Sequence, residues 1–254
     1  MSNIRVTYTG LLSFAIAIIT IILGIIFTLV LTRQFSTEEY GTWGLINGLL
    51  IYVTMIGPII SFWATRETSR GIESGKTAVL GSTFLSCGSA IIYILIAYFM
   101  GSQTQTDQSV LVFATILVPA IFLNGILTAI NLGWKPHTIS YGTLSFGLSQ
   151  VFFVMIFVFY LDLGVTGAIL TNLFSYFISI TILFIFARKK LRNSFNKIFI
   201  KKWFNLAWLP LYPSLSIMVD GLGIAIFSII TGSVIGLAFW TAAIVIPSVI
   251  SHAG

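Results

Sequence analysis

Long uncharged stretches alternate with short polar segments along most of the chain. A membrane-spanning helix needs about 20 mostly apolar residues, and the apolar stretches have about that length. The pattern therefore predicts eight spans: Leu11–Leu31, Gly41–Thr65, Thr77–Met100, Val110–Leu132, Thr138–Leu161, Val165–Ala187, Leu206–Thr231 and a last span that begins near Leu237. A membrane β-barrel would show segments of about ten residues with polar alternation. These are absent, so we expect an all-α polytopic transmembrane helix bundle, because a helix satisfies its own backbone hydrogen bonds in lipid.

Composition supports the same fold class. The 254 residues are 57% hydrophobic and 8% charged, whereas a soluble domain carries about 25% charge. So few charges cannot cover a water-exposed surface, and a net charge of +6 spread this thinly does not indicate a nucleic-acid partner. Cys87 is the only cysteine, which excludes an intrachain disulfide and a cysteine-rich metal site. Its apolar surroundings predict a buried packing residue.

Loop charges predict the orientation, because basic residues gather on the cytoplasmic side of a membrane. With the N-terminus placed in the cytoplasm, 12 of the 13 basic residues fall inside. Arg33 is the exception, and Asp107 and Asp162 both fall outside. We therefore expect a multi-pass protein of the cell membrane with a cytoplasmic N-terminus.

The segment Arg188–Asn205 carries seven basic residues interleaved with apolar ones at helical spacing. One interpretation is an amphipathic helix lying on the cytoplasmic leaflet, with its cations near anionic lipid. The other is a solvated charge run that only enforces topology. Either way the segment divides the chain into a six-helix repeat at 1–187, a basic amphipathic linker at 188–205, and the start of a second repeat at 206–254.

A slide of 195 residues places Leu11 on Leu206 and Gly41 on Gly236, as expected for the repeated bundles from which transporters are often built. The stretch at 31–50, LTRQFSTEEYGTWGLINGLL, has Arg33 closing the first helix and Tyr40-Gly41 opening the second. The stretch at 208–243 has Pro210, an intramembrane acid and a glycine-containing turn. In these features the chain resembles the N-terminal part of Wzx-type polysaccharide flippases of the multidrug/oligosaccharidyl-lipid/polysaccharide (MOP) exporter superfamily.

The resemblance implies a flippase that moves a lipid-linked oligosaccharide across the cytoplasmic membrane for surface polysaccharide biosynthesis, without a cofactor. Its partners would be that substrate, membrane lipids, and glycosyltransferases or a polymerase of the same pathway. Such proteins have twelve or fourteen spans, so we expect this chain to be a fragment or a truncated gene product. The alternatives are a cation-coupled multidrug antiporter of the same superfamily, a membrane-embedded glycan-assembly enzyme, and a non-transporting scaffold subunit.

Few residues are candidates for catalysis or substrate binding. The sequence has no Ser-His-Asp set, phosphate-binding glycine loop or metal-ligand cluster, so we do not expect an enzyme. An intramembrane carboxylate is costly, which makes Asp220 either a cavity residue or a structural hydrogen-bonding partner. Arg33 could pair with a lipid-carrier phosphate, or it could snorkel to the interface or pair with Glu38. Amides inside the spans are candidate cavity residues or interhelical contacts: Asn47, Asn124, Asn131, Gln150 and Asn172. Pro58 and Pro119 are expected to kink their helices, and Gly44 and Gly48 to allow close helix contact.

Overall fold

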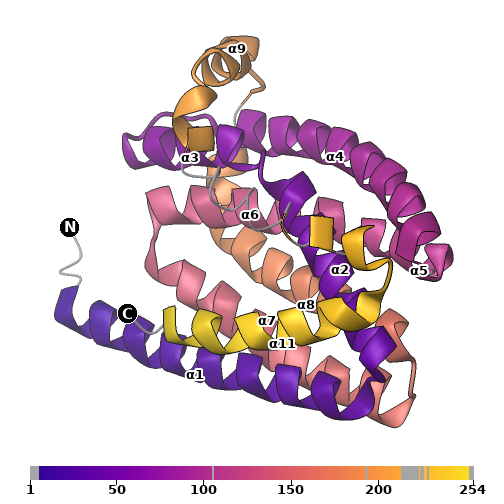
Figure 1. Ribbon diagram of the computed structural model, residues 1–254. Coiled ribbons are helices and arrows are strands. Elements are labelled where there is room, and N and C mark those ends of the chain that lie inside the picture. The colour runs from indigo at the N-terminus through magenta and orange to yellow at the C-terminus, as the bar shows by residue number, and fades with distance from the viewer. Residues whose placement is uncertain are drawn as a thin grey trace.

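The computed structural model is a bundle of helices packed side by side (Figure 1). It describes residues 6–104, 106–192, 194–212, 223, 226–227 and 229–251. The elements that cross the bundle are α1 (Val6–Gln34), α2 (Thr37–Thr54), α3 (Pro58–Ser69), α4 (Gly75–Thr104), α5 (Gln108–Phe113), α6 (Leu117–Trp134), α7 (His137–Val154), α8 (Gly164–Ala187) and α11 (Val234–Ser251). These described residues form no strand, and the predicted all-α membrane bundle is confirmed.

Within the described residues, five helices are long and apolar enough to cross a membrane. A sixth span results if the bent pair α2–α3 is counted as one. Two of the five continue through irregular turns: α5 leads through the 3₁₀ turn η1 (Ala114–Ile116) into α6, and α7 ends in the π-helical segment η2 (Met155–Tyr160). These six spans match the first six predicted ones to within a few residues at most boundaries.

The turn between α1 and α2 is built by a capping box. The Ser36 hydroxyl accepts from the Glu39 backbone N–H at 3.2 Å, and the Glu39 carboxylate accepts from the Ser36 N–H at 2.9 Å. The two bonds satisfy backbone donors that a helix start leaves free. They explain why the polar segment between the first two apolar runs ends one helix and begins another.

The second predicted span is broken rather than continuous. Its two parts, α2 and α3, meet at an angle of 58°, and Pro58 occupies the first turn of α3. Proline has no N–H to donate to the Thr54 carbonyl and bends or breaks a helix; here the Thr54 carbonyl accepts from Gly57 instead, at 2.9 Å. The expected effect of Pro58 is confirmed. Pro119 also affects its helix. In an α-helix its ring would clash with the carbonyl four residues earlier, at Thr115, and the backbone there forms the 3₁₀ turn η1 instead.

The loops divide into two groups at opposite ends of the bundle. One end gathers the turns at Ser36, Asp107, Asp162 and Gly232, which line one cavity. The other end gathers the basic segments, where the Lys190 ammonium lies 4.3 Å from the Trp134 ring centroid. The loops therefore alternate between the two ends as the charge pattern predicts: Arg33, Asp107 and Asp162, the charged residues predicted outside, lie at the first end.

The basic segment after α8 is only partly helical. It starts with a 3₁₀ turn (Arg188–Leu191), and the helix α9 covers Lys197–Asn205. Trp203 on α9 is fully buried, and its Nε1 donates to Glu67 Oε1 at 3.2 Å. Lys202 Nζ donates to the same oxygen at 3.2 Å. Part of the apolar face of α9 therefore packs on α3 and α4 (Figure 1), while Ile198 stays 73% exposed.

Helix α11 packs against α2 through glycines. A Cβ on Gly41 would meet the Val234 carbonyl oxygen, and a Cβ on Gly44 would meet the Thr241 hydroxyl. Gly44 of the expected pair thus approaches α11 closely, Gly48 is buried on the same helix, and Gly41 adds a further close approach. Residue numbers rise together along both helices, so α2 and α11 run in the same direction. The start of α11 falls two residues beyond the position that the 195-residue slide assigns to it.

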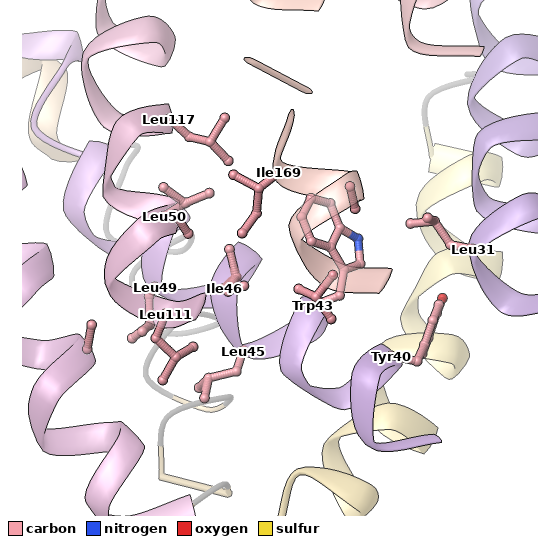
Figure 2. Close-up of a cluster of buried hydrophobic side chains, with 14 of the residues drawn as sticks. Leu31, Tyr40, Trp43, Leu45, Ile46, Leu49, Leu50, Leu111, Leu117 and Ile169 are labelled. Atoms are coloured by element: carbon pink, nitrogen blue, oxygen red, sulfur yellow. The ribbon is translucent and has the colours of Figure 1, made fainter. Parts of the chain in front are cut away.

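The interior is apolar and spans several helices. Figure 2 shows Trp43, Leu45, Ile46, Leu49 and Leu50 of α2 among side chains of neighbouring helices. Ile46 and Leu45 are completely buried. In contrast to our expectation, Cys87 is exposed on α4, because the uncharged stretch around it turns an apolar face to lipid as well as to the core. Half of the seventh predicted span, including Asp220, lies outside the described residues.

Candidate functional site

The candidate site is a central cavity of about 400 Å³ in the middle of the bundle. It lies among α1, α2, α6, α7 and α8. Asn47 is the eleventh residue of α2, about 15 Å along the helix axis at 1.5 Å per residue, which is about half of the 30 Å hydrocarbon thickness. The cavity therefore lies near the middle of the membrane. Its lining comprises Phe27, Trp43, Asn47, Leu50, Ile51, Thr54, Leu117, Ile121, Phe146, Gln150, Asn172 and Tyr176.

Three amides supply the polar surface of the cavity. Gln150 Nε2 of α7 donates to Asn172 Oδ1 of α8 at 2.8 Å, which holds two side chains from different helices together. Asn47 Nδ2 donates to the Trp43 carbonyl of its own helix at 2.8 Å. These bonds leave the Gln150 carbonyl and the Asn172 amino group available to a ligand, since an amide has one acceptor and one donor group. Three of the five predicted amides, Asn47, Gln150 and Asn172, thus line the same cavity.

The rest of the lining is aromatic and uncharged. Phe27, Trp43, Phe146 and Tyr176 surround the amides, and none of the described lining residues carries a charge. Phe146 and Tyr176 contact each other with ring centroids 4.8 Å apart. Flat aromatic faces beside amide donors and acceptors form a surface that binds amphipathic molecules through stacking and hydrogen bonds.

The other two predicted amides hold helices together. The Ser179 hydroxyl of α8 donates to Asn124 Oδ1 of α6 at 2.9 Å. Asn131 is fully buried, and its Nδ2 donates to the Leu183 carbonyl at 3.0 Å while its Oδ1 accepts from Thr138 at 3.2 Å. Both amides bridge α6 to α8, and neither lines the central cavity. The interhelical alternative therefore fits their geometry.

The structure places Arg33 away from the central cavity. It is exposed at the end of α1 and lines a separate surface groove. Among the described residues Arg33 forms no ion pair with Glu38, because the one ion pair found there joins Lys202 to Glu67. Asp220 lies outside the described residues, so its predicted place in the cavity stays a prediction.

A second, larger hollow opens at the end of the bundle that holds the α1–α2 turn. Its volume is about 730 Å³, and four of the seven acidic residues line it: Glu38, Glu39, Asp107 and Asp162. We call it the acidic vestibule. Gly164 has a φ of 52°, and a Cβ there would meet the Glu39 carboxylate, so glycine permits this close approach.

Local hydrogen bonds favour the ionised form of one vestibule residue, Asp107. Asp107 caps α5, and its Oδ1 accepts from the Ser109 N–H at 2.8 Å. Bonds from the side chain and backbone of Ser109 lower the pKa of Asp107. Residues of α2 line both hollows: the vestibule is lined by Glu38, Glu39 and Thr42, and the central cavity by Trp43, Asn47, Leu50, Ile51 and Thr54.

Glu67 is the buried charged residue that sequence reasoning missed. Its side chain is 3% exposed, and its second oxygen has no hydrogen-bond partner among the described residues. In the sequence it is one of several charges in a loop segment, and its partners lie 135 and 136 residues later. No local pattern identifies it, because its burial depends on α9 folding back over α3.

The fold is the one found in MOP-superfamily transporters. A MOP superfamily transporter from Pyrococcus furiosus Vc1 (DSM3638), whose binding pocket is described as having reverse polarity that suggests a different function, aligns with a TM-score of 0.65 and 15% identity. The alignment covers 95% of this chain and 59% of that one.

Two conformations of a multidrug resistance MATE family transporter of the MOP superfamily are similarly related. The inward-facing one gives a TM-score of 0.64 at 14% identity, covering 92% of this chain and 60% of that one. The outward-facing one gives 0.64 at 15% identity, with 98% and 61% covered. The chain thus spans about 60% of the length of these structures. No protein-family model matches the sequence, and no curated protein matches it significantly.

Proposed function

We propose that this protein belongs to a membrane exporter that moves lipid-linked oligosaccharide across the cytoplasmic membrane. The observation that carries the proposal is the uncharged central cavity, in which Asn47, Gln150 and Asn172 lie among aromatic side chains. Sugar hydroxyls both donate and accept hydrogen bonds, as amides do, and sugar rings stack on aromatic faces. The fold shared with MOP-superfamily transporters supports transport as the activity.

The cavity would act on the glycan part of the substrate. Its 400 Å³ holds a small ligand or one part of a larger one. The amide pair of Gln150 and Asn172 connects α7 to α8, so a sugar that bonds to both would be held across two helices. In an alternating-access cycle such a site binds from one leaflet and releases to the other when the surrounding helices shift.

A cation-coupled multidrug antiporter is the second candidate, and two observations favour it. Aromatic faces attract organic cations, and four aromatic residues line the cavity. The acidic vestibule would raise the local concentration of cations at one end of the bundle. A membrane-embedded glycan-assembly enzyme is a third alternative, which would require polar catalytic groups at one membrane face.

Deletion of the gene in its source cell distinguishes the three. For a flippase we expect loss of surface glycan together with accumulation of complete lipid-linked oligosaccharide on the cytoplasmic side. Sensitivity to cationic dyes with normal surface glycan would instead identify the antiporter. A truncated or missing lipid-linked sugar would identify an enzyme.

Point variants then test the cavity itself. Gln150→Leu and Asn172→Leu should reduce glycan export in complemented cells, because each removes polar groups from the cavity wall. The matched control is Gln103→Leu, an amide at an exposed position of α4, which should restore export fully. Normal export by both cavity variants at normal protein levels would reject this cavity as the glycan site.

A further inference from the structure

A groove on the outer face of α1 takes no part in the proposed transport site. It lies between the last turns of α1 and the π-helical segment η2, with a volume of about 290 Å³. Its lining comprises Ile26, Leu29, Val30, Arg33, Gln34, Met155 and Phe159. None of these residues lines the central cavity or the acidic vestibule, so the groove is a separate feature.

The walls of the groove are apolar and uncovered. The α1 residues recur at positions 26, 29, 30 and 33, which form one stripe on a helix. Leu29, Met155 and Phe159 are 51%, 42% and 53% exposed. The opposite wall is π-helical, with the Leu161 N–H bonded to the Ile156 carbonyl five residues earlier. Because α1 and η2 are membrane-spanning, a hydrocarbon chain is the natural occupant of the space between them.

The end of the groove presents a cation without a protein partner. Arg33 is exposed, and no described side chain or carbonyl bonds to its guanidinium. Glu38 and Glu39 follow it closely in sequence, yet both line the acidic vestibule, and Glu39 is held in the capping box with Ser36. The guanidinium is therefore available to an anion from outside the protein, and its fork of donors matches a phosphate.

The groove has the position and length to hold a lipid whose headgroup lies at the membrane surface and whose chain follows α1. Arg33 lies in the last turn of α1, at the level where lipid headgroups begin. From there to Ile26 the groove follows α1 for seven residues, about 10 Å at 1.5 Å per residue. We propose that this groove binds a bilayer glycerophospholipid, with its phosphate on Arg33 and one acyl chain between α1 and η2. The proposal does not depend on which cargo the central cavity takes.

Native mass spectrometry of the purified full-length protein tests the proposal, with dioleoyl-phosphatidylglycerol as the probe. Arg33→Gln should weaken binding of the first lipid about tenfold, the lower end of the effect expected for losing a hydrogen bond to a charged group, because Arg33 is exposed. Leu29→Trp should weaken it comparably by filling the groove while Arg33 remains. Dioleoylglycerol, which has the same chains and no phosphate, should bind wild type and Arg33→Gln equally weakly.

Arg66→Gln is the matched control, because Arg66 lies at the other end of the bundle, 5.5 Å from the Phe62 ring centroid. It should leave the first binding event unchanged. Equal weakening by Arg33→Gln and Arg66→Gln would overturn the proposal, since lipid would then respond to net charge alone. Unchanged affinity in Leu29→Trp would also overturn it, because the acyl chain would then lie elsewhere.

Discussion

Replacing Trp203 with phenylalanine should release the linker helix α9 from the bundle. The indole N–H of Trp203 donates to a carboxylate, Glu67, that is 3% exposed, and Trp203 itself is fully buried. Phenylalanine keeps an aromatic ring in the same place and removes only the donor and part of the ring. The variant therefore removes the hydrogen bond between segments 136 residues apart, together with part of the buried ring.

The magnitude follows from the two donors that share Glu67 Oε1. A hydrogen bond to a charged group contributes about 1.5–3 kcal/mol. We expect a value toward the upper end of that range when both partners are buried, as Trp203 and Glu67 are. Lys202 is the other donor, but its side chain is 49% exposed. Ion pairs open to water contribute about 0.2–1 kcal/mol, so the buried indole should contribute more than the ammonium.

Hydrogen exchange of the α9 backbone amides, followed by mass spectrometry, measures the opening of this contact. Exchange through local opening is governed by the free energy of that opening. Since 1.4 kcal/mol corresponds to a factor of ten, Trp203→Phe should speed exchange in α9 by about 10- to 150-fold. Lys202→Met should speed it by no more than about fivefold.

The comparison between the two variants decides the matter. If Lys202→Met accelerates exchange as much as Trp203→Phe, the exposed ion pair holds the linker and the reasoning from burial fails. Exchange in α8 serves as the internal control and should be the same in all variants. Glu67→Gln retains an oxygen that can accept both bonds, so it should fall between the two.

Three further predictions follow from other contacts. Gly41→Ala should destabilise the protein by about 1–3 kcal/mol, because the new Cβ would meet the Val234 carbonyl; Gly88→Ala, with nothing within 4 Å, should be neutral or stabilising by up to about 1 kcal/mol, as thermal unfolding in detergent would show. Asn131→Leu should cost about 1–3 kcal/mol by removing the buried bonds that its side chain makes to the Leu183 carbonyl and the Thr138 hydroxyl, with no change in substrate preference in a transport assay. A cysteine at Asp107 should react with an impermeant thiol reagent added outside the cell, and one at Lys197 should not; the reverse pattern would invert the orientation.

Run length and charge were sufficient to predict most of the fold. The apolar stretches predicted the number and position of the first six spans, because a segment that crosses lipid must be long enough and must satisfy its own backbone hydrogen bonds. Loop charges also separated the two ends of the bundle correctly, since Asp107 and Asp162 share one hollow with the α1–α2 turn. The break between α2 and α3 was expected from Pro58, although its 58° angle depends on how both helices pack.

The candidate site was only partly predictable. Amides within apolar spans are rare enough to identify Asn47 and Asn172, but sequence does not show which face of a helix meets a cavity. Asn124 and Asn131 have the same chemistry and serve as interhelical bonds instead. Cys87 shows the same ambiguity, because a membrane helix is apolar on its lipid face as well as its buried face. The burial of Glu67 could not be predicted from the sequence, because it depends on a contact with Trp203, 136 residues later.

The close contact between α2 and α11 has a mechanical consequence. Two close approaches lie in the first half of each helix, where a Cβ on Gly41 would meet Val234 and a Cβ on Gly44 would meet Thr241. α2 has 18 residues and is therefore about 27 Å long. A rod held tightly near one end acts as a lever with its pivot there. Thr54 lies ten residues beyond Gly44, about 15 Å along α2, so a tilt of about 10° around the glycines would move it by about 3 Å, and a small rotation near one membrane face would become a larger displacement toward the other.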